Sequence, residues 1–476
     1  IAVIGDGALT GGLAFEAFNN GVNGCENLIV ILNDNKMSIS RNVGSMSKHL
    51  TNVRTSKGYF NLKSGVRHVL AKIPKIGNLV NRALTFINTE IRKRVYNDAT
   101  FFEDLGFRYY GLIDGHDMES LISVLNAAKE HNHSVLIHVN TKKGKGYDPA
   151  EKNPTQFHGI GKFDVATGET NYGGKSFSDV FGETMCSLAE KDGRICAVTA
   201  AMAEGTGLAE FANKYPKRFF DVGIAEQHAV TFSSGLAKNG LIPVFAVYST
   251  FLQRSYDQLI HDVAMQNLKV IFGIDRAGFV GEDGESHQGV FDVSYLNTIP
   301  YFTVYSPSCY DELSYMLGQA VYHDTGAVAV RYPRGKEKEM PKDYHYDKSD
   351  YSVFGTDDSK NCIITYGVEF SECYAALKEL EDTFIIKLNK IKPIESSIFN
   401  LINHNKNVFF FEESIKSGSV GEVFAAMLEE KGICASFHHI CIKDEFVKQA
   451  SVESQLKAYS LDKNSVVSIV KEVSNV

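Results

Sequence analysis

Two polar residues near the start of the chain have the types and spacing of a metal site. The apolar run at residues 1–4 is followed by Gly5-Asp6-Gly7, and a second apolar run at residues 27–33 is followed shortly by Asn35. Short apolar runs predict buried parallel strands, and glycines let the backbone approach a ligand closely. Parallel strands end at one edge of their sheet, so we expect Asp6 and Asn35 to meet there. A carboxylate, an amide oxygen and nearby carbonyls suit a Mg²⁺ ion that also binds a diphosphate.

A dinucleotide site is the alternative for the same stretch. Gly5 and Gly7 stand between an expected strand and an expected helix, but the next glycine is Gly11, which misses the G-x-G-x-x-G spacing. The second strand also ends without a solitary acidic residue, because Asp34 stands between two asparagines. This alternative predicts NAD binding that needs no Mg²⁺, and it stays open here.

Glu226 is the second candidate for chemistry. It lies in the stretch DVGIAEQHAV, between an expected strand and an expected helix, among small and apolar residues. These neighbours would remove water from the carboxyl group and raise its pKa. Such an acid can share a proton with a ring nitrogen of a cofactor. The alternative is a glutamate in the first turn of a helix, satisfied by backbone N–H groups.

Two polar loops that follow later strands, at residues 275–289 and 331–335, carry charged residues and a histidine. Their candidate residues are Arg276, Asp283, His287, Arg331 and Arg334. Arginines at the carboxyl edge of a sheet suit a substrate phosphate, which a guanidinium binds through two hydrogen bonds. Structural ion pairing is the alternative.

The segment at residues 248–257 follows another expected strand and offers two further side chains. Phe251 either stacks on a pyrimidine ring or is an ordinary core aromatic. Arg254 is either the partner of a charged group or part of a solvated face.

The elements that must position these residues alternate between strands and helices. This rhythm predicts an α/β protein with mainly parallel sheets flanked by helices. A chain of 476 residues should hold roughly three domains. We place them at residues 1–170, with a helical insertion at about 46–100, at 171–337, and at 353–476. The last domain shows no acid–base constellation, so we expect a structural role that includes subunit contacts.

Individual elements follow from the apolar runs and their spacing. Helices are expected at residues 9–20, 121–129 with Asp117 as N-cap, 176–190 and 420–431. Strands are expected at residues 107–113, 134–139, 195–199, 219–222, 242–247, 269–274, 327–331, 362–365, 383–386, 408–411 and 435–437. Residues 147–170 and 336–352 are expected to be a loop and a linker.

Composition narrows the class of protein. The net charge of −8 argues against nucleic acid as the main partner. Eight cysteines without a C-x-x-C pair indicate reduced thiols in a cytoplasmic compartment. No apolar run approaches the length of a membrane span. The basic stretch at residues 56–97 suggests either an anionic partner or a solvated helical insertion, and we favour the insertion. A start at Ile1 indicates the body of a longer protein, whose targeting peptide would be out of sight.

Seven stretches together resemble the transketolase-like thiamine-diphosphate enzymes. They are GDGALTGGLAFEAFNNG, ILNDNKMSIS, KKGKGYDPAEKNPTQFHG, DVGIAEQHAVTF, YSTFLQRSYDQLIHD, DRAGFVGEDGESHQGVFDVSYL and RYPRG. The resemblance covers nearly the whole chain, and HQGVFDVSYL and YSTFLQRSYDQ favour the members that condense pyruvate with D-glyceraldehyde 3-phosphate over transketolase proper. It implies a homodimer in which both catalytic domains of one subunit form the site. Ketol transfer between sugar phosphates and a catalytically silent subunit on the same fold stay as alternatives.

The resemblance also implies roles for single residues. On the cofactor side, Mg²⁺ on the diphosphate would be held by Asp6, Asn35 and the Met37 carbonyl, with Gly5, Gly7 and Ala8 beside the cofactor. Glu226 would activate thiamine diphosphate, and Phe251 would stack on its pyrimidine.

On the substrate side, the resemblance implies that Tyr248, Arg276 and Arg334 bind the phosphate of glyceraldehyde 3-phosphate. Asp283 would contact the hydroxyl of that substrate, and His158 and His287 would line the reacting centre and assist proton transfers. One departure stands out. The family carries a histidine-containing segment upstream of the GDG motif, which nothing in this chain can match.

Overall fold

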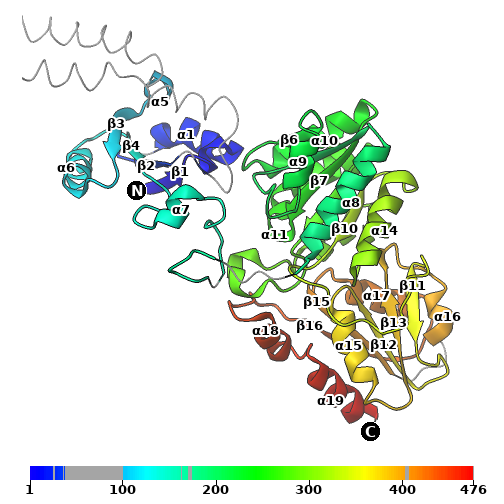
Figure 1. Ribbon diagram of the computed structural model, residues 1–476. Coiled ribbons are helices and arrows are strands. Elements are labelled where there is room, and N and C mark those ends of the chain that lie inside the picture. Colours follow the sequence, from blue (N-terminus) through cyan, green and yellow to red (C-terminus); the bar gives the residue numbers. More distant parts are fainter. Residues whose placement is uncertain are drawn as a thin grey trace, which may run out of the picture. The chain divides into compact units, whose positions relative to one another are not determined.

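The computed structural model describes residues 1–24, 27–35, 37, 100–161, 163–169, 174–402 and 407–474. The expected basic stretch at residues 56–97 lies outside these described residues. The chain folds as two compact units, of which the first comprises residues 1–171 with 223–225 and the second residues 172–222 with 226–476. Figure 1 shows the elements of both. Of the helices in the described part of the chain, none is long and apolar enough to cross a membrane.

The first unit is built on a parallel four-stranded sheet of order β1-β2-β4-β3. Its strands are β1 (Ala2–Gly5), β2 (Ile29–Asp34), β3 (Arg108–Asp114) and β4 (Val135–Asn140). Its helices are α1 (Gly12–Gly24), α5 (Thr100–Asp104), α6 (Met118–Lys129) and α7 (Asp148–Lys152). As predicted, the side chain of Asp117 caps α6 by accepting a hydrogen bond from Ser120 N–H.

Three predictions for this unit need correction. The first strand was expected to be buried, but β1 lies at the edge of the sheet and is mostly exposed. The helix expected at residues 9–20 is interrupted: a 3₁₀ turn, η1 (Ala8–Thr10), comes first, Gly11 is extended, and α1 begins at Gly12. Here the hydroxyl of Thr10 donates to the carbonyl of Gly7 and closes the turn locally. The loop expected at residues 147–170 contains the short helix α7, which begins with Asp148 and Pro149.

The second unit contains a seven-stranded sheet of order β14-β9-β10-β8-β7-β5-β6. Its strands are β5 (Ile195–Thr199), β6 (Phe219–Asp221), β7 (Ile242–Tyr248), β8 (Ile271–Asp275), β9 (Thr303–Tyr305), β10 (Val328–Arg331) and β14 (Lys390–Lys392). Its helical segments are α8 (Phe177–Lys191), α9 (Ala209–Lys214), α10 (Glu226–Lys238), α11 (Ser249–Leu252), η2 (Gln253–Ser255), α12 (Tyr256–Gln258), η3 (Leu259–Ala264), η4 (Gly281–Asp283), η5 (Glu285–His287), α13 (Asp292–Thr298) and α14 (Tyr310–Tyr322). The sequence pattern missed β9 and β14, which have three residues each, although it found β6, which is equally short.

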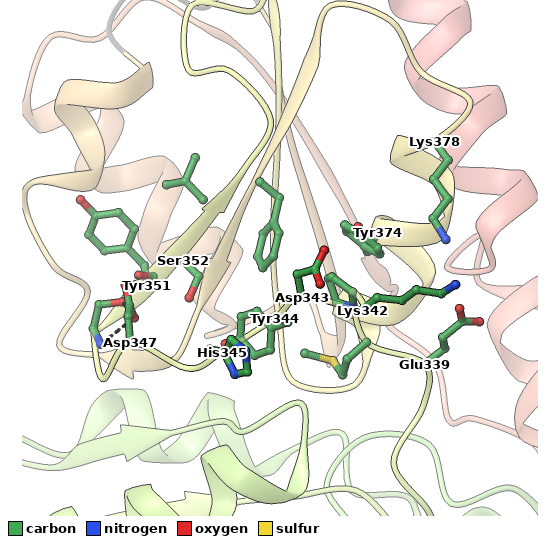
Figure 2. A pocket seen from close by; sticks show the side chains of 15 residues that line it. Glu339, Lys342, Asp343, Tyr344, His345, Asp347, Tyr351, Ser352, Tyr374 and Lys378 are labelled. Carbon is green, nitrogen blue, oxygen red and sulfur yellow. Dashed lines mark hydrogen bonds between the residues drawn. The ribbon is translucent and has the colours of Figure 1, made fainter.

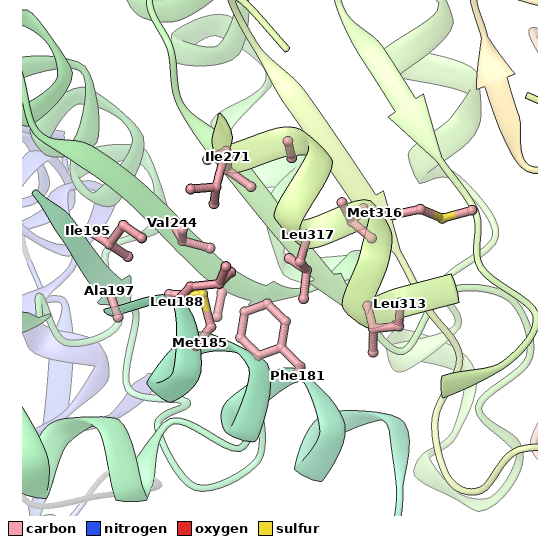
Figure 3. Close-up of a cluster of buried hydrophobic side chains, with 14 of the residues drawn as sticks. Phe181, Met185, Leu188, Ile195, Ala197, Val244, Ile271, Leu313, Met316 and Leu317 are labelled. Carbon is pink, nitrogen blue, oxygen red and sulfur yellow. The ribbon is translucent and has the colours of Figure 1, made fainter. Parts of the chain in front are cut away.

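The core of this sheet is made by α8 and α14, which pack against each other and against the strands. Figure 3 shows Phe181 and Met185 of α8 facing Leu313 and Leu317 of α14, with Ile271 of β8 beside them. All five side chains are fully buried. This packing fixes the strands whose carboxyl ends carry the candidate residues.

A five-stranded sheet of order β11-β13-β12-β15-β16 completes the second unit. Its strands are β11 (Tyr351–Phe354), β12 (Asn361–Tyr366), β13 (Thr383–Leu388), β15 (Asn407–Ile415) and β16 (Ser436–Ile442). Its helices are α15 (Glu369–Leu377), α16 (Ile398–Ile402), α17 (Val420–Glu430), α18 (Val452–Ala458) and α19 (Lys463–Ser474). The four expected strands are present and parallel, but β11 adds an antiparallel edge that begins inside the expected linker.

The chain crosses between these two sheets more than once. After β13 it enters β14, which pairs antiparallel with β9 at the edge of the seven-stranded sheet. The ammonium of Lys392 then donates to backbone carbonyls around the end of α13, among them those of Leu296 (2.7 Å) and Asn297 (3.0 Å). The α/β fold with mainly parallel sheets is confirmed, whereas the expected domain boundaries stay a prediction.

Candidate active site

In the first unit, Asp6 and Asn35 follow the ends of neighbouring parallel strands. Gly5 pairs with Asn33 in the β1–β2 register, and Asp6 N–H donates to the carbonyl of Asn33 at 3.1 Å. Asp6 and Gly7 are buried, whereas Gly5 before them and Ala8 after them are exposed. The carboxylate therefore sits at the base of an edge whose backbone is open.

The donor set at this edge fits a hard cation. Asn35 Oδ1 accepts a hydrogen bond from Met37 N–H at 3.0 Å, which holds the amide oxygen in place and leaves its second lone pair for a metal. A Cβ built on Gly5 would meet no atom within 4 Å, so a ligand can reach the backbone there. One carboxylate and one amide oxygen beside open backbone are compatible with Mg²⁺ and a diphosphate.

The structure argues against the dinucleotide alternative, because Asp34, the acidic residue at the end of the second strand, is bound elsewhere. Asp34 is fully buried, and its Oδ2 lies 2.9 Å from His138 Nε2 on β4. The other ring nitrogen of His138 lies 2.7 Å from the hydroxyl of Tyr109. A carboxylate held in such a network is not positioned to bind the hydroxyls of a ribose.

His158 is held by a lysine in the same unit. Lys143 Nζ contacts His158 Nδ1. Because an ammonium can only donate, Nδ1 is the acceptor and a neutral ring carries its proton on Nε2. Burial, followed by the charge of Lys143, lowers the pKa of His158 and favours that neutral form. Burial also lowers the pKa of Lys143, and the charge of Asp6 partly opposes this.

In the second unit, Glu226 is the first residue of α10 and only 2% of it is exposed. Its Oε2 forms an ion pair with Nη1 of Arg254, which resolves the role of that arginine as a charged partner. Burial raises the pKa of Glu226, and the charge of Arg254 offsets only part of this rise. A buried carboxyl with a raised pKa fits a group that shares a proton with a ring nitrogen.

Phe251 stands between two other candidate residues. Its ring lies nearly parallel to that of Tyr248, with centroids 5.8 Å apart, and edge-on to His287 at 5.4 Å. Phe251 is half-buried rather than part of the core, so one side remains available for stacking.

The guanidinium of Arg276 lies over the ring of Tyr248, 3.6 Å from its centroid. Burial raises the pKa of Tyr248 to about 12, so the hydroxyl stays protonated as a donor. Arg276 has a φ of +61°, a backbone conformation that costs energy in a residue other than glycine and is often found at functional sites.

Asp283 joins the two candidate phosphate-binding arginines. Its Oδ2 lies 3.6 Å from Arg276 Nε, and its Oδ1 lies 3.2 Å from Arg334 Nη1. Within the described residues, buried Arg276 Nε has no hydrogen-bond partner. Two cationic groups that converge on one point with an unused donor fit an anionic ligand.

Arg331, from the same stretch as Arg334, follows the structural alternative. It is buried, and it binds Asp292 through Nε at 3.0 Å and Nη2 at 3.1 Å. Both residues belong to the interior that supports the site. In the stretch at residues 331–335, Arg334 is therefore the remaining candidate for binding a phosphate.

The residue that sequence reasoning missed as a site component is Lys143. The only local signal was the KKGKG run after the expected strand at residues 134–139. The spacing of Lys143 and His158 did not indicate their contact. The helix at residues 148–152, which separates them in the sequence, was expected to be a loop.

The predicted residues thus form two sets. Asp6, Asn35, Met37 and His158 belong to the first unit, and Glu226, Tyr248, Phe251, Arg276, Asp283, His287 and Arg334 belong to the second. A pocket of about 800 Å³, between residues 339–349, β11 and α15, is lined by none of them (Figure 2). In the described residues, no group of three or more His, Cys, Asp or Glu side chains could hold a metal ion.

Family models match three stretches of the chain. A model described as 1-deoxy-D-xylulose-5-phosphate synthase matches residues 1–141. The transketolase pyrimidine binding domain matches residues 174–338, and the transketolase C-terminal domain matches residues 353–466.

Solved structures support the fold. The chain is similar to a split-gene transketolase described as an inactive beta4 tetramer, with a TM-score of 0.56 and 22% identity over 63% of this chain and 98% of that one. It is also similar to transketolase from Campylobacter jejuni, with a TM-score of 0.53 and 16% identity over 99% of this chain and 76% of that one.

Curated relatives are more similar in sequence. The 1-deoxy-D-xylulose-5-phosphate synthase of Clostridium tetani is 43% identical over 99% of this chain and 77% of its own length. Those of Clostridium acetobutylicum and Caldanaerobacter subterraneus are each 45% identical, over 97% and 99% of this chain and 75% and 76% of their own lengths. Identity of this extent, together with the matching family models, places the chain in the 1-deoxy-D-xylulose-5-phosphate synthase family.

Proposed function

We propose that the protein joins pyruvate to D-glyceraldehyde 3-phosphate, with release of CO₂, to give 1-deoxy-D-xylulose 5-phosphate. This reaction supplies precursors of isoprenoids, thiamine and pyridoxal. The observation that carries the proposal is the contact series from His287 through Phe251 and Tyr248 to Arg276. It sets residues suited to a pyrimidine ring directly beside residues suited to a sugar phosphate.

Thiamine diphosphate and Mg²⁺ are the cofactors that we propose. Asp6 and Asn35, with the Met37 carbonyl, would hold Mg²⁺ on the diphosphate, beside Gly7 and the exposed Gly5 and Ala8. Bound thiamine diphosphate would supply the electron sink for loss of CO₂ from pyruvate. The homodimer stays a prediction.

Glu226 and Phe251 would meet the pyrimidine ring. Glu226, with its pKa raised by burial, would hold a proton against a ring nitrogen. Arg254 would keep the carboxyl oriented through the ion pair to Oε2. Phe251, supported on one side by Tyr248, would present the face of its ring to the pyrimidine.

The remaining residues would bind and orient the substrates. Arg276 and Arg334 would grip the phosphate of glyceraldehyde 3-phosphate, and the protonated Tyr248 hydroxyl would donate to it. Asp283 would turn from the two arginines towards the hydroxyl of the substrate. His287 and neutral His158 would hold or move protons at the reacting centre.

The test uses the full-length protein with pyruvate and D-glyceraldehyde 3-phosphate, with and without thiamine diphosphate and Mg²⁺. We expect the five-carbon sugar phosphate, detected by mass spectrometry, only when both cofactors are present. Transfer from xylulose 5-phosphate without use of pyruvate would favour transketolase activity instead. No turnover of either donor would favour a silent subunit.

A further inference from the structure

We propose that Glu413, on β15 of the five-stranded sheet, is a positioning residue for the acceptor substrate. It would act by fixing the loop at residues 278–289, which carries Asp283 and His287. This inference rests on the proposed function, because the sugar-phosphate role of that loop does. It assigns to the C-terminal sheet a part in substrate binding in addition to the structural role that its sequence suggested.

The first observation is a hydrogen bond across a long stretch of chain. Glu413 Oε2 accepts from the backbone N–H of Phe279 at 2.8 Å, and the bond is buried. The preceding residue, Gly278, has a φ of +78°, and a Cβ on it would lie only 2.2 Å from the same oxygen. The backbone comes this close to the carboxylate because residue 278 is glycine.

The second observation is that this bond lies at the base of the loop. Gly278 and Gly289 exchange two backbone hydrogen bonds, of 2.8 and 2.9 Å, which close residues 278–289 into one unit. On the other side of the closure, Ser414 Oγ and Ile415 N–H both donate to the carbonyl of Val290, at 3.3 and 3.1 Å. Three consecutive residues of β15 therefore hold both ends of the loop.

The loop in turn sets the geometry of the phosphate-binding side chains. Arg334 Nη1 donates to the carbonyl of Val280, next to Phe279, at 3.0 Å and also contacts Asp283. A shift of the backbone at residues 279–280 would therefore move Arg334 and Asp283 relative to each other. Small misplacements of binding groups have large effects on a bound substrate.

Two variants separate the effect of the length of the Glu413 side chain from the effect of its charge. Glu413→Gln keeps an oxygen acceptor at the same reach and loses the charge. Glu413→Asp keeps the charge but withdraws the oxygens by one methylene. Glu412 supplies the matched control, because it is a buried carboxylate on the same strand whose partners are Tyr366, His439 and Gly421 N–H, away from the loop.

We expect Glu413→Asp to raise the KM for glyceraldehyde 3-phosphate about tenfold, the effect of losing one buried hydrogen bond. The KM for pyruvate should not change. Glu413→Gln should stay close to wild type in both, and Glu412→Gln should lower thermal stability without separating the two KM values. An unchanged KM in Glu413→Asp, or a defect in Glu413→Gln alone, would overturn the proposal.

A second measurement does not depend on turnover. Amide hydrogen exchange of the peptide containing Phe279 should be faster in Glu413→Asp than in wild type, and it should be restored in Glu413→Gln. Equal protection in all three proteins would overturn the proposal even if the enzyme is active. If the wild type makes no product, the proposed function fails, and this exchange result alone decides whether Glu413 holds the loop.

Discussion

The two candidate regions are built by different means. In the first unit, the edge around Asp6 and Asn35 consists of strand ends, short polar side chains and open backbone. In the second unit, the site consists of long charged side chains in ion pairs, such as Glu226 with Arg254, on a fully packed sheet. A backbone-built edge needs few partners because the fold itself places its oxygens. A site of long side chains needs contacts from distant parts of the chain to hold each side chain in one of its several rotamers.

The largest effect is expected at Glu226, where the second region would carry the chemistry. We expect Glu226→Gln to lower kcat by about 10²–10⁴-fold, the usual range for removal of a general acid–base group. The amide cannot share a proton with the pyrimidine nitrogen. Steady-state assays with both substrates measure this, and circular dichroism checks the fold. Activity within threefold of wild type would remove Glu226 from the mechanism.

The next effect concerns a buried ion pair of the second unit that lies outside the candidate site. Lys387 and Glu312 form a fully buried ion pair of 2.7 Å, and Lys387 also donates to Asn389. Lys387→Met leaves the Glu312 carboxylate buried and uncompensated, which should lower the free energy of unfolding by about 3–5 kcal/mol. Urea unfolding gives this value. Assays below the unfolding transition should return wild-type KM values. A selective change in one KM would contradict a purely structural role for this ion pair.

A smaller effect is expected at the sheet edge of the first unit. Asp6 and Asp34, at the ends of the neighbouring strands β1 and β2, offer a matched pair of variants. Asp6→Asn should weaken Mg²⁺ binding by about 100-fold or more, since losing even an outer partner of a metal ligand costs about 10–100-fold. Asp34→Asn should instead reduce stability, because Asp34 pairs with buried His138. Titration of activity with Mg²⁺ compares the two. An equal shift in both variants would mean that Asp6 is not a direct ligand.

The smallest effect is a pH dependence of stability that arises from the buried carboxyl. Burial raises the pKa of Glu226 above its ordinary value of 4.5. Such a group costs the folded state stability as the pH rises from 4.5 through the folded-state pKa. Glu226→Gln cannot ionise, so the free energy of unfolding of this variant should increase relative to that of wild type as the pH rises above 4.5. A difference that stays constant or shrinks over this range would contradict the raised pKa.

The elements near Asp6 illustrate what sequence patterns reveal. The apolar runs and the GDG turn placed β1 and β2 to within about two residues, a normal error for element boundaries. They also placed Asp6 and Asn35 at one sheet edge. The 3₁₀ turn at Ala8–Thr10 escaped prediction, since a hydroxyl-to-carbonyl bond gives no periodic signal. Strands β9 and β14 also escaped prediction, whereas β6 of the same length was found.

What the sequence determined by itself was local: the α/β rhythm, the strand ends, and the motifs that resemble one enzyme family. Only the tertiary structure decided which charged groups meet. Glu413 and Phe279 are 134 residues apart, and Lys387 and Glu312 are 75 apart. It also separated Arg331, bound to Asp292, from Arg334 near Asp283. The physical reason is that local patterns encode which face of an element is buried, whereas partners across a sheet are chosen by packing of the whole chain.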